Sequence, residues 1–177
     1  MKISQRSVFV ATVGAISVLA AFAALYLTRD AAPPFKATPL LKDAPRLTIA
    51  EVEELLRANF TVFHTVEEIP RAVRLDYTAL TGNKFEMVDP GHGRSTDAII
   101  PGLPNKELVF VGLADQSAVL IFRRGGIADT INVVVFSHKG NGGMWGARID
   151  DYSVRDISGL RDALQKGKFE AWDDRVP

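Results

Sequence analysis

The sequence predicts an α+β domain: an antiparallel four- to five-stranded β-meander packed with about three helices, preceded by one N-terminal transmembrane helix or signal segment. Three observations lead to this prediction. Several apolar runs rich in Val, Ile and Phe follow one another between turn residues. Other segments repeat apolar residues at helical spacing. Finally, residues 7–28 carry no charged side chain.

The uncharged run at residues 7–28 follows Lys2 and Arg6. As a helix rising about 1.5 Å per residue, it is long enough to cross the apolar core of a bilayer. Its best small-x-small triplet, at residues 21–23, is followed by more apolar residues, which favours an uncleaved signal anchor over a cleaved signal peptide. Because the basic end stays inside, the rest is expected outside the cytoplasmic membrane as a single-pass protein, in the periplasm if the cell is Gram-negative. Secretion after signal cleavage is the alternative.

The composition changes after residue 30. Residues 31–45 contain four prolines, which predicts a semi-rigid spacer. A single domain is then expected at residues 46–168, followed by an acidic tail at residues 169–177.

Three segments repeat apolar residues at helical spacing, near residues 49–59, 69–80 and 157–164. Capping signals mark their starts, and glycines mark the ends of the last two. These signals are Thr48 with Glu51, Pro70, Gly82, Ser153 with Asp156, and Gly167.

Three strong strand signals lie at residues 108–113, 118–122 and 131–136, and a weaker one at residues 144–149. The first three runs are apolar on both faces, so both faces of the sheet should be covered. We expect helices on one face and the long loop at residues 89–104 on the other.

Composition argues against several classes of partner and cofactor. The chain has zero formal net charge, which gives nucleic acid no general electrostatic attraction. It has no cysteine, and its three histidines form no i,i+4 pair, so neither a metal site nor a cofactor is predicted. The glycines at residues 140–146 do not match a phosphate-binding loop and predict a hairpin turn instead.

Four residues are weak candidates for catalysis. His92, Ser95 and Asp97 lie in one loop and include the types needed for a nucleophile, its base and an orienting group. His138 is a second possible base. A polar loop built from Asx and Ser turns is the simpler and preferred explanation for the first three. These residues support the alternative function, a small envelope hydrolase with a histidine base.

The predicted meander brings distant polar residues together, because alternate turns lie at the same end of a sheet. Gln116 should lie near His138 at one end, and Arg123 and Arg124 near Asp129 and residues 150–151 at the other. The arginines could bind an anionic group, or simply form an ion-pair network on the surface.

The leading functional prediction is a membrane-anchored extracytoplasmic module that is not an enzyme and that binds a protein or a cell-envelope component. The loop at residues 89–97 and the hairpin at residues 140–145 are its expected contact elements. Candidate binding residues are Arg94, Arg123, Arg124, His138 and Trp145. Trp145 could be an aromatic anchor for a partner or part of the core.

Overall fold

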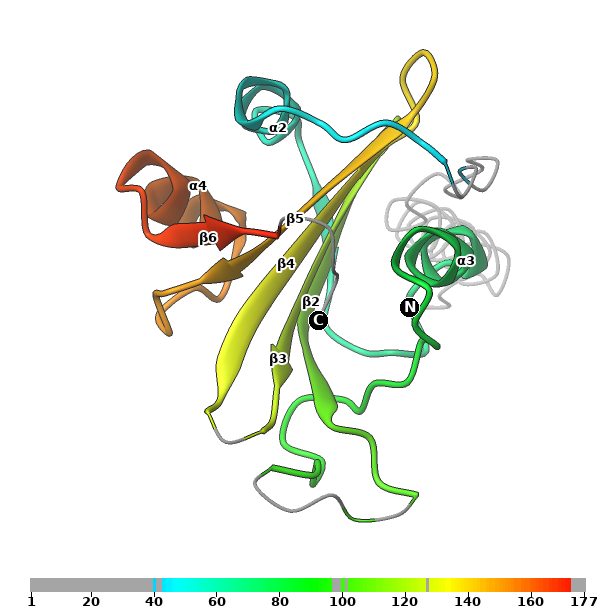
Figure 1. Cartoon of the computed structure of the whole chain (residues 1–177), viewed down its shortest axis with the longest axis vertical. Coiled ribbons are helices and arrows are strands. Elements are labelled where there is room, and N and C mark those ends of the chain that lie inside the picture. Colours follow the sequence, from blue (N-terminus) through cyan, green and yellow to red (C-terminus); the bar gives the residue numbers. More distant parts are fainter. Residues whose placement is uncertain (1–39, 41–42, 97–99, 101, 127, 173–177) are drawn as a thin grey trace, which may run out of the picture. The chain divides into compact units, whose positions relative to one another are not determined.

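The computed structural model describes residue 40 and residues 43–96, 100, 102–126 and 128–172, which all belong to one compact unit, residues 35–177. This part contains three helices and one six-stranded antiparallel sheet, so the α+β class is confirmed (Figure 1). The uncharged run at residues 7–28 lies outside the described residues. Within the described ranges, no helix has the length and apolar character needed to cross a membrane.

The six strands lie in the sheet in their order along the chain, and each pairs antiparallel with the next. Four strands were predicted from apolar runs. The two edge strands, of three residues each, raise the number to six, and strands this short have no recognisable alternation. The strands are β1 Thr61–Phe63, β2 Lys106–Ala114, β3 Ser117–Arg124, β4 Thr130–Ser137, β5 Gly143–Ile149 and β6 Phe169–Ala171.

The helices are α2 Ile49–Leu55, α3 Arg71–Thr81 and α4 Ile157–Gln165. The capping box of α2 is confirmed: the Thr48 hydroxyl accepts a hydrogen bond from the Glu51 N–H, and the Glu51 carboxylate accepts one from the Thr48 N–H. The helix is shorter than predicted. Gly82 ends α3 with a φ of 69°, as expected for glycine at this position.

The predicted start of α4 was wrong. The N-cap is Asp156, whose carboxylate accepts a hydrogen bond of 2.7 Å from the N–H of Gly159. The hydroxyl of Ser153 instead donates to Asp151 in the preceding turn. Two consecutive turn-forming segments therefore precede this helix, and only the second caps it.

Asp156 makes α4 sensitive to acid. The N–H of Gly159, followed by the hydroxyl of Ser158, lowers the pKa of Asp156 below its ordinary value. Because the pKa of Asp156 is lower in the folded than in the unfolded state, its carboxylate contributes to stability fully above a pH of about 4. This contribution is lost as the pH falls through the folded-state pKa. We expect Asp156→Ala to cost about 1 kcal/mol at pH 7, and the difference from wild type to shrink towards pH 3. Urea unfolding at several pH values measures this, and a difference independent of pH would contradict it.

Each face of the sheet is covered by helix, which corrects the expectation that helices cover one face and the long loop the other. α2 and α4 pack on one face, against alternate residues such as Val119, Ile121 and Val133. α3 packs on the opposite face, against Leu120 and Phe122 among others (Figure 1). Among the described residues, none of the long loop joins this apolar cluster, and Phe85 and Met87, just before the loop, pack on the α3 side instead.

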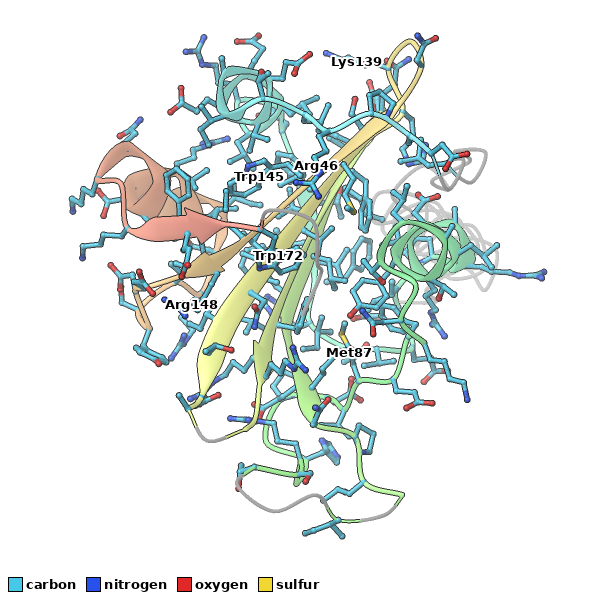
Figure 2. The ribbon with its side chains drawn as sticks, viewed as in Figure 1. Arg46, Met87, Lys139, Trp145, Arg148 and Trp172 are labelled. Carbon is cyan, nitrogen blue, oxygen red and sulfur yellow. The ribbon has the colours of Figure 1, made fainter. Side chains whose placement is uncertain are left out.

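The outer edge of β5 is covered by both ends of the described chain. Residues 45–47 pair with its first half, through hydrogen bonds of 2.9 and 3.0 Å to the backbone of Met144. β6 pairs with its second half, and the N–H of Trp172 continues this pairing to Gly146. The guanidinium of Arg46 donates to the Trp172 carbonyl at 3.0 Å, which joins the two segments. Figure 2 shows Arg46 and Trp172 close together beside β5. Residues 169–172, expected in the tail, thus belong to the sheet layer.

Candidate functional site

A fully buried carboxylate, that of Asp76, lies at the end of the sheet that carries the β4–β5 hairpin. One of its oxygens, Oδ2, is 3.1 Å from Nε2 of His138, whose side chain is only 9% exposed. The other, Oδ1, accepts a hydrogen bond of 2.6 Å from the N–H of Leu40. Asp76 therefore ties together α3, the hairpin and the segment that enters the domain.

The predicted proximity of two turns at this end is confirmed. The N–H of His138 donates to the carbonyl of Gln116 at 2.8 Å. This hydrogen bond joins the turn between β2 and β3 to the start of the β4–β5 hairpin. Sequence reasoning missed Asp76. The available signal was its spacing, because it lies three residues after Val73 and next to Tyr77 on the apolar, buried side of α3. A carboxylate on such a stripe needs a partner in the interior.

The β4–β5 hairpin has a braced base and an exposed tip. Gly140 and Gly142 adopt positive φ values of 57° and 74°, which confirms the predicted turn. The side chain of Leu40 packs so closely on Gly142 that a Cβ there would lie 2.4 Å from it. Lys139 and Asn141 are exposed at the tip, and Figure 2 shows Lys139 pointing away from the sheet.

The opposite end of the sheet carries an ion-pair cluster that includes Arg94 from the long loop. The Arg94 guanidinium is 2.9 Å from Glu107 through Nε and 2.9 Å from Asp129 through a terminal nitrogen. Asp129 also pairs with Arg123 at 2.6 Å. The predicted proximity of Arg123 and Asp129 is confirmed, whereas Arg94 was not expected in this cluster. Two cations and two anions balance one another, so the cluster holds the loop on β2 and β3.

Arg94→Ala should release the long loop. It removes a side chain that is only 9% exposed and leaves Glu107 and Asp129 without one of their cations, which is expected to cost about 2–3 kcal/mol. Hydrogen exchange should accelerate at the N–H groups of Ser95 and Gly125, which bond to Pro104 and Asn105 across the base of the loop. Arg57→Ala is the control, since its ion pair is highly exposed and should matter little. Equal effects of the two variants on stability and exchange would contradict the role of Arg94.

The other candidates from the long loop differ in accessibility. His92 is exposed, and Ser95 is buried with its hydroxyl accepting a hydrogen bond of 3.2 Å from the N–H of Ile100. Asp97 lies outside the described residues. The hydrogen bond to Ser95 therefore helps to anchor the loop, and a catalytic role for His92 or Ser95 stays a prediction.

The neighbouring arginines of β3 point to opposite faces of the sheet, as alternation requires. Arg123 joins the ion-pair cluster, and Arg124 lies on the α3 side, opposite Lys106 of β2. Residues 150 and 151 lie at this same end of the sheet, as predicted, because Ile149 is the register partner of Ile131 and the hydroxyl of Tyr152 donates to the carbonyl of Asp129. Their ion pairs are with other cations, however: Asp150 pairs with Arg148 and Asp151 with Lys168. Their charges therefore brace the β5–β6 side.

Trp145 belongs to the core. It is 8% exposed and packs edge-to-face on Phe169, with ring centroids 5.8 Å apart. It lies on the face covered by α2 and α4. This position supports the second of its two predicted roles, because a side chain so enclosed cannot anchor a partner without opening the core.

Among the described residues, no group of three or more His, Asp or Glu side chains is arranged to hold a metal ion. Comparison of the chain with protein-family models, with curated proteins and with solved structures finds no significant match.

Proposed function

We propose that this chain is a membrane-anchored extracytoplasmic binding or accessory module that recognises a protein or a cell-envelope component. The anchor is the uncharged segment at residues 7–28, and the spacer at residues 31–45 leads into the folded domain. The contact elements are the β4–β5 hairpin and the long loop.

The observation that carries this proposal is the way in which both contact elements are held. Asp76 braces the base of the hairpin from the interior, while Lys139 and Asn141 remain exposed at its tip. Arg94 likewise fixes the base of the long loop, while His92 remains exposed. Rigid bases with exposed polar tips suit recognition, because little conformational entropy is lost on binding.

Photo-crosslinking in intact cells tests the proposal. A photoreactive amino acid placed at Asn141 or His92 of the full-length chain should give a discrete crosslinked adduct. The same amino acid at Glu53 or Gln165, exposed positions on α2 and α4, is the matched control. Adducts from all four positions alike, or from none, would contradict recognition through these two elements.

The proposed location has its own test. Before any protease is added, the full-length chain should sediment with the membrane fraction. Protease added to cells with a permeabilised outer envelope should then digest the domain. A full-length chain that stays in the soluble cytoplasmic fraction would refute the anchor and the compartment together.

One observation favours the second candidate, a small envelope hydrolase with a histidine base. The pair formed by Asp76 and His138 has the carboxylate–imidazole geometry that orients a general base. His138→Gln, compared with His64→Gln and His92→Gln, separates the two functions in an assay of envelope-polymer turnover by the purified chain. Loss of turnover only in the His138 variant would favour the hydrolase, and no turnover by wild type would exclude it for that substrate.

A further inference from the structure

On the α3 side of the sheet, two cations lie directly opposite each other on neighbouring strands. Lys106 of β2 and Arg124 of β3 are register partners, so their side chains start about 5 Å apart on the same face. Like charges in this position destabilise a sheet. No carboxylate of the described residues comes within 4 Å of either cation, in contrast to the balanced cluster on the other face.

The next pair of residues on the same two strands points to the opposite face of the sheet and carries opposite charges. On the α2 and α4 side, Glu107 is the register partner of Arg123, a pair of opposite charges, and Arg94 and Asp129 complete the balance. On the α3 side, the equivalent position holds two positive charges. At this pair of positions the described chain thus balances the charges on one face and sets two cations opposite each other on the other, with the charge of Glu86 acting on Lys106.

Lys106 is also unusually buried for an unpaired lysine, with only 8% of its surface exposed. Its ammonium lies 5.4 Å from the centre of the Tyr77 ring, a cation–π contact that lessens the cost of burial but does not neutralise the charge. Burial, and then the charge of Arg124, lowers the pKa of Lys106, while Glu86 opposes the change.

The hydroxyl of Tyr77 provides the third group. It is buried and has no hydrogen-bond partner among the described residues. Burial raises the pKa of Tyr77 to about 12, so the phenol stays protonated and can donate a hydrogen bond, while the nearby charge of Arg124 and then the side chain of Thr81, one turn along α3, oppose the shift. A buried donor without an acceptor is costly, and an oxyanion would supply the acceptor.

We propose that Lys106, Arg124 and the Tyr77 hydroxyl form a binding site for a dianionic oxyanion of the phosphate type. The two positive charges match a dianion, the planar guanidinium can donate two parallel hydrogen bonds to it, and the phenol donates a third. The site lies on the α3 face at the base of the long loop, where the Lys106 carbonyl accepts a hydrogen bond from the N–H of Val88, and it does not depend on the proposed function.

Calorimetric titration of the full-length, detergent-solubilised chain with inorganic phosphate tests the site, with sodium chloride at matched ionic strength as the screening control. Wild type should bind phosphate saturably at one site. Lys106→Gln and Arg124→Gln should each weaken binding about tenfold or more. Lys84→Gln is the matched control, because it removes the same charge from an exposed position and should leave binding unchanged.

Thermal unfolding supplies a second readout that separates binding from folding. Without phosphate, Lys106→Gln and Arg124→Gln should unfold at the same temperature as wild type or higher, since each relieves repulsion between the two cations. Tyr77→Phe should barely change the unfolding temperature without phosphate, yet it should weaken phosphate binding several-fold. Acetate in place of phosphate shows whether a monoanionic carboxylate suffices, which would overturn the preference for a dianion. Absence of saturable phosphate binding by wild type, or equal weakening in Lys84→Gln, would overturn the site itself.

Discussion

Gly146→Ala is expected to destabilise the domain by about 1–3 kcal/mol, although it adds a single methyl group. A Cβ at Gly146 would lie 2.1 Å from an atom of the Trp172 ring, which covers this position on the α3 side of β5. Trp172 is itself held by the hydrogen bond from its N–H to Gly146 and by the bond from Arg46 to its carbonyl. The ring cannot move away without loosening both segments that cover the edge of β5. Urea unfolding of the full-length chain measures the loss.

Two variants make this prediction specific. Gly159→Ala adds the same methyl group inside α4, where the nearest atom is 3.4 Å away, so it should be neutral or stabilising by up to about 1 kcal/mol. In a Trp172→Ala background, Gly146→Ala should cost much less, because the clash is gone. A cost that is the same with and without the Trp172 ring would show that the close packing is not its cause.

Asp76→Ala is expected to have the largest effect of any charged residue in the described chain, about 3 kcal/mol or more. The substitution deprives His138 of its buried partner and leaves the N–H of Leu40 without its acceptor. It also opens space beneath α3, because Asp76 is completely buried. Chemical denaturation, followed by circular dichroism, measures the change in the free energy of unfolding.

The controls for Asp76 separate its charge from its hydrogen bond. Asp76→Asn keeps an acceptor for Leu40 and removes only the charge, so it should cost less than Asp76→Ala. Asp162→Ala breaks an exposed pair with Lys166 on α4 and should cost no more than about 0.5 kcal/mol. If Asp76→Ala behaved like Asp162→Ala, the buried carboxylate would not hold this end of the sheet together.

Local signals in the sequence predicted most individual elements correctly. The capping box of Thr48 and Glu51, the glycine after α3 and the central strands depend on interactions between residues close along the chain. Local patterns failed where two signals competed. Ser153 and Asp156 both resemble helix caps, and only the geometry of the preceding turn, with Asp151, decides between them.

The edge strands illustrate a different failure. β6 and the paired segment at residues 45–47 are too short to show an apolar alternation, and they form because their backbone groups find partners on β5. The same limit applies to the candidate sites. Spacing along the strands predicted the meeting of Arg123 with Asp129, whereas Arg94 reaches them from a long loop whose path no local pattern specifies.

The sequence by itself determined the class of the domain, the central meander and most helix ends, because these follow from hydrophobic periodicity and from capping within a few residues. Only the tertiary structure decided which helix covers which face, how Asp76 meets His138, and that Lys106 and Arg124 face each other without a described anion between them. These features join residues far apart along the chain. Their energies depend on burial and strand register, which exist only once the sheet has formed.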